Sequence, residues 1–363
     1  MPIVFIFKPF SHVINIGMGH SVMNAMTEWT YEKAGVSIDR KSDAISSLVS
    51  ELKYRREGKG QSVKKSGLFA SLISFGHDYL TLATDGVGSK LMVAQALNKW
   101  DTVGIDCVAM NVNDTICVNS EPISFVDYVA IADPDPDITR AIGIGLNKGA
   151  EMSNMEIVGG EIAILPEIVR IPDLSGTCLG HVKRSDVITG EECEEGDLIV
   201  ALKSSGIHSN GLTLARKVFE SSGLELTEKA SGLDETIGEK LLTPTEIYVK
   251  QVLDITSKYD VHGLVNVTGG GLRNLLRMKS NLNYIIDDPI KPANIFKTIQ
   301  KLGNVTDNEM YQTFNMSMGF MIIASSVDAE SMVRENKNSQ VVGRVEEGTG
   351  VLFEPENLVY DHY

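Results

Sequence analysis

The chain has 363 residues, with 33 lysines and arginines against 48 aspartates and glutamates, so its formal net charge is −15. A chain of this length usually divides into two domains, because single hydrophobic cores stop growing at about 250 to 300 residues. The acidic balance argues against a nucleic-acid-binding protein, which would carry a basic patch. The one basic cluster, residues 53–56, lies between Glu51 and Glu57 and is interpreted as a solvated helix end.

No stretch is long and apolar enough to span a membrane, and the four cysteines show neither CxxC spacing nor a histidine partner at zinc-finger distance. Thiols of cytosolic proteins normally stay reduced. The sequence therefore predicts a cytoplasmic protein with no membrane and no nucleic-acid partner.

The chain divides into three predicted segments. Residues 1–25 differ in character from the rest and are predicted to be an extension that contributes little to function. Residues 26–193 form the predicted first domain, which contains a helix over residues 44–55 by its apolar spacing. An acidic, turn-like stretch at residues 191–196 precedes the next strand, so the second domain is predicted over residues 194–363.

The most informative segment is residues 84–90 (TDGVGSK), which follows an apolar and β-branched run. That run predicts a strand, so Asp85 is expected where the strand opens into a loop. In that position Asp85 can hold Mg²⁺, while Lys90 can neutralise phosphate oxygens. The residues here that would let a phosphate approach backbone N–H groups are Gly86, Gly88 and Ser89. An ordinary β-turn with a solvated lysine is the alternative.

An apolar pattern of helical period predicts a helix over residues 101–118. Asp106 and Asn113 fall on one face of that helix, with Asp114 beside them. One interpretation is a polar edge that faces water. The other is a second carboxylate cluster that faces Asp85 and shares Mg²⁺ with it across a phosphate chain.

A third polar group is found at residues 157–161 (IVGGE). A short strand is predicted to end there in a turn at Gly159 and Gly160, which would present the carboxylate of Glu161. A plain hairpin turn with an exposed glutamate is the alternative.

The second half opens with a loop at residues 204–211 (SSGIHSNG), followed by a predicted helix over residues 212–221. The amino end of that helix would add backbone donors suited to an anion. His208 can act as a general acid or base or donate to a phosphate, or it can be a surface histidine in a capped turn. The triple glycine at residues 269–271 is also predicted to lead into a helix. The phosphate-binding candidates in these loops are Ser209, Asn210, Gly211, Thr268, Gly269, Gly270 and Gly271.

The segments YEKAGVSID, TDGVGSK, GIDCVAMNVND, VGGE, SSGIHSNG, LLTPTEIYVK, VTGGG and MYQTFN occur in this order. Together they resemble the aminoimidazole ribonucleotide synthetases, the phosphoribosylformylglycinamidine cyclo-ligase family, from about Tyr31 to beyond Gly319. The resemblance implies an α+β fold of two domains. The N-terminal half would have a mixed sheet that forms a barrel with a second subunit, as a homodimer, and a C-terminal α+β domain would pack beside it.

The resemblance also implies ATP-dependent ring closure of formylglycinamidine ribonucleotide to aminoimidazole ribonucleotide, a step of purine synthesis, with ATP and Mg²⁺ as cofactors. By motif, Asp85 and Asp114 would be metal ligands, with Asp106 and Glu161 near the metal or substrate. The residues that would meet phosphates or donate hydrogen bonds are Lys90, Asn113, Gly159, Gly160, His208 and Asn210.

Two departures from the family pattern are visible. A glycine-rich loop of many relatives is represented only by residues 66–70 (SGLFA), and a histidine often found before the triple glycine is Asn266 here. An essential imidazole at that point is therefore not expected.

Other members of the same ATP-binding superfamily are the alternatives. A selenophosphate synthetase would need a cysteine or selenocysteine near its amino end, yet none precedes Cys107. A hydrogenase maturation protein would end in a reactive cysteine, whereas this chain ends in Tyr363. A thiamine monophosphate kinase and a catalytically silent regulatory subunit are the remaining alternatives.

Overall fold

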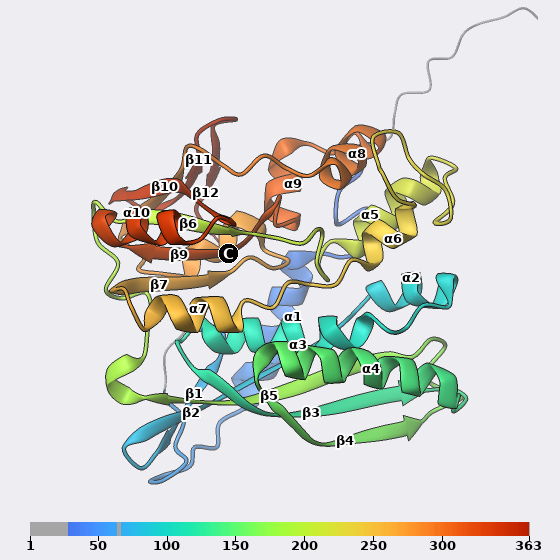
Figure 1. Ribbon diagram of the computed structural model, residues 1–363, viewed down its shortest axis with the longest axis horizontal. Helices are drawn as coiled ribbons and strands as arrows, with labels where there is room; N and C mark the ends of the chain where they lie inside the picture. The colour runs from blue at the N-terminus through green and yellow to red at the C-terminus, as the bar shows by residue number, and fades with distance from the viewer. Residues whose placement is uncertain (1–27, 64–66, 363) are drawn as a thin grey trace, which may run out of the picture.

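The computed structural model describes residues 28–63 and 67–362, which form two halves that are each built on one β-sheet (Figure 1). The predicted extension, residues 1–25, lies outside the described residues. The elements of the first half are α1 (Ile38–Glu51), β1 (Ser71–Phe75), β2 (Asp78–Gly86), α2 (Lys90–Leu97), α3 (Val103–Ile116), β3 (Glu121–Ile131), α4 (Pro136–Ser153), β4 (Glu156–Ile164), β5 (Asp173–Lys183) and the 3₁₀ turn η1 (Arg184–Asp186).

The elements of the second half follow without interruption. They are β6 (Leu198–Lys203), α5 (Leu212–Ser221), α6 (Ile237–Leu242), α7 (Val249–Thr256), β7 (Val261–Asn266), the 3₁₀ helix η2 (Gly271–Arg277), β8 (Leu282–Ile286), α8 (Asn294–Gly303), α9 (Asp307–Thr313), β9 (Met318–Ala324), α10 (Ser326–Glu335), β10 (Ser339–Glu347), β11 (Gly350–Phe353) and β12 (Leu358–Tyr360).

The first half holds a mixed five-stranded sheet in the order β1-β2-β5-β3-β4, in which only β3 and β4 run parallel. Alternate residues of β5, among them Leu174, Cys178 and Val182, are buried against the core, as expected of a sheet with one covered face. Gly176 in this strand is required by packing, because a Cβ atom there would lie 2.0 Å from Cζ of the buried Phe125.

The second half holds a seven-stranded sheet in the order β12-β11-β8-β10-β6-β9-β7, and every residue of β9 is buried. Helices α3, α4 and α7 lie between the two sheets (Figure 1). Helix α3 is therefore central, and its polar residues Asp106, Asn111 and Asn113 are almost fully buried. A polar edge that faces water, one of the two interpretations of this helix, is thus wrong for Asp106 and Asn113.

No helix of the described residues covers the outer face of the five-stranded sheet (Figure 1). Apolar side chains are exposed on it, including Leu82, Val126 and Tyr128, which are about 40% exposed. Strands β1 and β4 form the edges of this sheet, and neither sheet of the described residues closes into a barrel. The α+β architecture with two sheets confirms the predicted fold class at that level.

Several predicted elements are confirmed, including the strand that leads into Asp85 and the helices over residues 101–118 and 212–221. The turn predicted at Gly159 and Gly160 is wrong, because β4 runs through both glycines and pairs with β3. Tertiary pairing overrides the turn preference of the two glycines here. The helix after the triple glycine is a 3₁₀ helix, and α1 begins and ends earlier than predicted.

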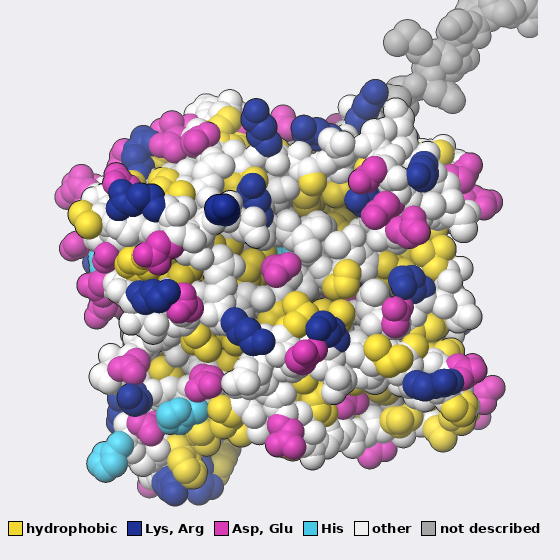
Figure 2. Space-filling view, viewed as in Figure 1, with side chains coloured by type: hydrophobic (Ala, Val, Ile, Leu, Met, Phe, Trp, Pro, Cys, Tyr) yellow, Lys and Arg dark blue, Asp and Glu magenta, His cyan; other side chains and the backbone are white. Residues whose placement is uncertain are grey.

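Two surface properties bear on the classes of partner. No helix within residues 28–63 and 67–362 has the length and apolarity needed to cross a membrane. On the face in view in Figure 2, basic side chains are interspersed with acidic ones rather than gathered in one patch. That face offers no basic footprint for a nucleic acid.

Candidate active site

One pocket of about 270 Å³ brings together residues from both halves of the molecule. Six of its lining residues are among the predicted site residues, namely Asp85, Asp114, Asn210, Thr268, Gly269 and Gly270. The other lining residues are Tyr31, Val36, Lys41, Ile45, Arg273 and Arg277. The pocket therefore joins the end of β2, the side of α3 and the two glycine-containing loops of the second half.

Burial raises the pKa of both carboxylates of the pocket. Asp85 is the second-last residue of β2, and the N–H of Gly86 donates to its Oδ1 over 2.7 Å. The Asp85 side chain is open to the pocket, yet the surrounding protein still desolvates it enough to raise its pKa. Burial raises the pKa of Asp114 to about 7, and the negative charge of Asp85 adds to that increase.

Two neighbours of Asp114 partly offset this increase in its pKa. Asn266 Nδ2 donates to Asp114 Oδ1 over 2.8 Å, and this hydrogen bond together with the positive charge of Arg277 lowers the Asp114 pKa. Asn266 thus occupies the position where relatives were expected to have histidine, and it supplies a donor whose charge does not change with pH.

The residues fit a bound Mg²⁺ ion. Burial is the main cause of the raised Asp114 pKa and the charge of Asp85 is a smaller one, and a divalent cation held by both carboxylates would neutralise the charges that make both effects unfavourable. Within the described ranges no group of three or more His, Cys, Asp or Glu side chains could hold a metal ion. Mg²⁺ is typically held by only one or two carboxylates together with substrate phosphates and water. The donor set therefore suits a metal that arrives with a nucleotide.

The basic residues that line the pocket, Lys41, Arg273 and Arg277, were not predicted from the sequence. Lys41 of α1 acts electrostatically on Asp85, and Arg277 lies over the ring of Phe69, with its guanidinium carbon 4.3 Å from the ring centroid. Arg273 Nε donates to the backbone oxygen of His362 over 3.0 Å. A signal was available, because Arg273 and Arg277 are four residues apart directly after the triple glycine.

The glycine-containing loops contribute in different ways. Gly269 lies against Asn210, since a Cβ atom on Gly269 would be 3.1 Å from Asn210 Oδ1. Gly211 and Gly271 are required by packing instead. Each has a positive φ, and a Cβ atom would lie 2.2 Å from Cε1 of Phe314 at Gly211 and 2.0 Å from the Tyr311 oxygen at Gly271. Neither Gly211 nor Gly271 lines the pocket.

Lys90 and Asp106 form a fully buried ion pair behind the pocket rather than in it. Lys90 Nζ donates to Asp106 Oδ1 over 2.8 Å and to the backbone oxygen of Thr243 over 2.6 Å. Burial lowers the pKa of Lys90, and the charge of Asp106 opposes that decrease. In this conformation the ammonium group does not line the pocket, so it has no direct contact to offer a phosphate.

Asn113, Ser89 and His208 are also engaged with protein atoms. Asn113 Nδ2 donates to the Glu246 backbone oxygen, and Asn113 Oδ1 accepts from the Tyr248 N–H. Ser89 Oγ accepts from the hydroxyl of Thr213. His208 is almost fully buried, and burial and the charge of Lys90 lower its pKa to about 3.

Glu161 lies on the opposite face of the sheet from Asp85. Glu161 is in register with Tyr128 of β3, whereas Asp85 and Asp127 both pair with Gly176 of β5. Consecutive strand residues point to opposite faces, so Glu161 belongs to the outer face together with Tyr128. Within one subunit, the structure does not bring Glu161 to the pocket.

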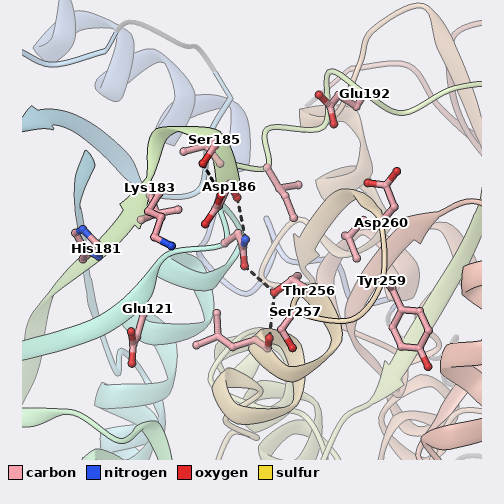
Figure 3. A pocket seen from close by; sticks show the side chains of 16 residues that line it. Glu121, His181, Lys183, Ser185, Asp186, Glu192, Thr256, Ser257, Tyr259 and Asp260 are labelled. Atoms are coloured by element: carbon pink, nitrogen blue, oxygen red, sulfur yellow. Dashed lines mark hydrogen bonds between the residues drawn. The ribbon is translucent and has the colours of Figure 1, made fainter. Parts of the chain in front are cut away.

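A second pocket lies between the end of β5 with η1 and the end of α7 (Figure 3). Its labelled side chains include Lys183, Asp186, Thr256 and Asp260. It contains none of the residues singled out by the sequence. The pocket with Asp85 and Asp114 is therefore the candidate active site.

Comparison with known families concerns the chain as a whole. Residues 69–182 match the family described as AIR synthase related protein, N-terminal domain, and residues 194–353 match AIR synthase related protein, C-terminal domain. The fold and the site thus define a two-domain protein of the AIR synthase related class.

Curated relatives show which family within this class the chain belongs to. The phosphoribosylformylglycinamidine cyclo-ligase of Methanococcoides burtonii is 50% identical over 319 residues, which cover 88% of this chain and 95% of that protein. The protein of the same name from Methanocaldococcus jannaschii is 47% identical over 326 residues, covering 87% and 92%. The chain therefore belongs to the phosphoribosylformylglycinamidine cyclo-ligase family, a family of ligases, which confirms the resemblance seen in the sequence.

Solved structures share the fold at much lower identity. A thiamine monophosphate kinase from Aquifex aeolicus has a TM-score of 0.60 and 17% identity, covering 89% of this chain and 99% of that chain. A hydrogenase maturation protein HypE in complex with ATP has a TM-score of 0.55 and 15% identity, covering 78% and 85%. At such identities the likeness concerns the fold alone.

Proposed function

We propose that this protein closes the imidazole ring of aminoimidazole ribonucleotide, using formylglycinamidine ribonucleotide and ATP and releasing ADP and phosphate. One observation carries the proposal beyond the family name. Two carboxylates, two arginines and two loops rich in backbone donors converge on a single pocket. Phosphoryl transfer needs such an arrangement, because its catalysis consists mostly of positioning and charge neutralisation.

The reaction follows from the chemistry of the formamide. Its oxygen is a poor leaving group, so the γ-phosphoryl group of ATP is transferred to it and the bond to ADP breaks. The ring-forming nitrogen then attacks the formyl carbon, and the carbon–oxygen bond breaks with release of phosphate. The ring-forming nitrogen and the formamide nitrogen each lose a proton as the ring forms. No step requires a nucleophilic side chain from the protein.

The pocket residues divide this work among them. Asp85 and Asp114 would hold Mg²⁺, which supplies charge neutralisation for the phosphate chain when it is bound. Arg273 and Arg277 provide positive charge for phosphate groups on the same wall. Asn210 and the loop at residues 268–270 line the same pocket, and the Asn210 amide and the backbone N–H groups of that loop would donate to phosphate oxygens.

His208 is not expected to transfer protons in this reaction. Its pKa of about 3 leaves the imidazole neutral at physiological pH. Its Nε2 faces the N–H groups of Ser205 and Glu246, at 3.4 and 3.5 Å. Its role is therefore to shape the loop that carries Asn210.

A homodimer is part of the proposal, and the outer face of the five-stranded sheet supports it. Leu82, Val126 and Tyr128 expose apolar surface on a sheet face that no helix within residues 28–63 and 67–362 covers. A second copy would cover this surface and could complete the barrel. Glu161 lies on the same face, so pairing would bring this acid to the subunit interface.

Light scattering tests the dimer. The expected mass is twice the 39.6 kDa of one chain. Val126→Asp would place a charge on the outer sheet face and should yield monomers. Val327→Asp on α10, an apolar residue that is 72% exposed elsewhere, is the matched control and should remain dimeric. A wild-type mass of one chain at micromolar concentration with full activity would contradict the dimer.

Two further elements complete the proposal. The boundary between the domains is placed between Cys193 and Glu194, in the connection that precedes β6. The protein is proposed to act in the cytoplasm, where its phosphorylated substrates are found.

The reaction is tested by incubating the purified protein with formylglycinamidine ribonucleotide, ATP and Mg²⁺. Aminoimidazole ribonucleotide, ADP and phosphate should form in equal amounts, and omission of any one component should stop all three. ATP consumption without ring closure, or ring closure without ATP, would contradict the proposed function.

A further inference from the structure

Asp106 joins the two halves of the molecule at a buried polar junction. Its Oδ1 accepts hydrogen bonds from Lys90 Nζ at 2.8 Å, from Ser209 Oγ at 3.1 Å, and from both the N–H and the hydroxyl of Thr245, at 2.8 and 2.6 Å. Asp106 and Lys90 belong to helices of the first half, whereas Ser209 and Thr245 belong to loops of the second half. Asp106 Oδ2 is buried without a partner among the described residues.

The segment that contains Thr245 is tied to the site residues along most of its length. The backbone oxygen of Thr243 accepts a hydrogen bond from Lys90, and the backbone oxygen of Pro244 accepts one from the hydroxyl of Ser205. The next residue, Glu246, has its backbone oxygen bound by Asn113. The segment at residues 243–248 therefore forms a belt that links α2 and α3 to the loop at residues 204–211.

The belt is connected to the pocket through Asp106, Ser209 and Asn210. Ser209, which donates to Asp106, directly precedes Asn210, whose side chain lines the pocket beside Gly269. A displacement of Ser209 would move Asn210 relative to Asp85 and Asp114, which are fixed on the first half. Misplacing a catalytic group by about 1 Å can cost about a hundredfold in rate.

We propose that Thr245 is a positioning residue: its hydroxyl and N–H, together with Lys90, hold Asp106 so that Ser209 and Asn210 are set against the two carboxylates of the pocket. Thr245 itself does not line the pocket. The inference rests on the proposed function, because it assigns a supporting role to a residue behind that same site. It also explains why a lysine and an aspartate are buried as a pair where neither can meet the substrate.

Three variants test the proposal. Thr245→Val keeps the shape and the N–H but removes the hydroxyl, and it should lower kcat about ten- to a hundredfold per folded molecule. Thr245→Ser restores the hydroxyl and should stay within about threefold of wild type. Thr298→Val changes a similarly buried threonine of α8 outside the belt, and it should leave kcat unchanged.

The readouts separate positioning from stability. A merely structural role would lower the thermal midpoint of Thr245→Val without changing kcat of the folded fraction, and that result would overturn the proposal. Equal damage in Thr245→Ser and Thr245→Val would overturn it too, since the hydroxyl would then not be the cause. If Thr245→Val does not fold, Ser209→Ala removes the next link and should lower kcat in the same range. An unchanged kcat in Ser209→Ala would then refute the inference.

Calorimetric binding of ADP with Mg²⁺ distinguishes this inference from the proposed function. Thr245→Val should bind ADP at least about tenfold more weakly than wild type, and Thr245→Ser should bind it normally. If wild type binds ADP but makes no aminoimidazole ribonucleotide, the proposed reaction fails while the weaker binding of Thr245→Val still supports the positioning role. If wild type is active and Thr245→Val matches it in kcat and in binding, only the positioning role fails.

Discussion

Asp114→Asn is expected to stabilise the metal-free protein at pH 8 while it abolishes turnover. Burial raises the Asp114 pKa from 3.8 to about 7. A carboxyl group with a raised folded-state pKa favours folding most below pH 3.8, and that contribution is lost as the pH rises to about 7, because the folded state binds the proton more tightly.

The size of the effect follows from this pKa difference. Each pKa unit corresponds to about 1.4 kcal/mol, so ionisation of Asp114 would cost at most about 4 kcal/mol. Because the pocket is open to solvent, the cost is expected to be about 1 to 3 kcal/mol. Asparagine carries no charge, and its Oδ1 can still accept the hydrogen bond from Asn266.

Urea unfolding at pH 5 and pH 8 in the presence of EDTA measures this difference. The free energy of unfolding of Asp114→Asn, relative to wild type, should increase by about 0.5 to 2 kcal/mol between the two pH values, because part of the cost is already present at pH 5. Added Mg²⁺ should stabilise wild type and not the variant. The exposed Asp133→Asn is the control and should show no such trend. A difference that does not depend on pH, or a variant less stable than wild type at pH 8, would refute the reasoning.

Three further predictions concern single residues of the site. Asp85→Asn should lower kcat by at least about a thousandfold with the fold intact, because it removes a proposed metal ligand; near-normal turnover at saturating Mg²⁺ would remove Asp85 from the site. His208→Asn should keep more activity than His208→Ala, because asparagine tolerates the left-handed backbone at φ 60°, and neither should shift the pH optimum, since the pKa of His208 is about 3. A rate profile governed by one ionisation near pH 6.5 would instead indicate that His208 transfers protons in the reaction. Arg277→Met should raise KM for the phosphorylated substrate about tenfold by removing a positive charge from the pocket, and an unchanged KM would count against that role.

Local sequence patterns predicted the acidic centre of the site well. Asp85 follows an apolar run, so its place at the end of β2 could be read from neighbouring residues alone. The apolar period of α3 likewise placed Asp114 on a helix. The meeting of these two acids in one pocket was a hypothesis about packing; in the structure Asp85 and Asp114 both line the pocket, whereas Asp106 does not.

Contacts between segments far apart in the sequence could not be predicted from the neighbouring residues of each segment. The burial of Lys90 against Asp106 depends on the packing of α2, α3 and the belt, so a lysine in a glycine-containing loop was predicted to contact phosphates directly. The turn before Glu161 was predicted wrongly because two adjacent glycines suggested it, whereas pairing with β3 keeps the strand extended and turns this acid to the outer face.

The central claim is that the formyl oxygen leaves as part of the phosphate, and isotope transfer tests it most directly. Formylglycinamidine ribonucleotide labelled with ¹⁸O in the formyl group would be converted in a single turnover, and the inorganic phosphate would be analysed by mass spectrometry. The account predicts one ¹⁸O atom in each phosphate released with ring closure. Unlabelled phosphate, with the label recovered in water, would contradict it.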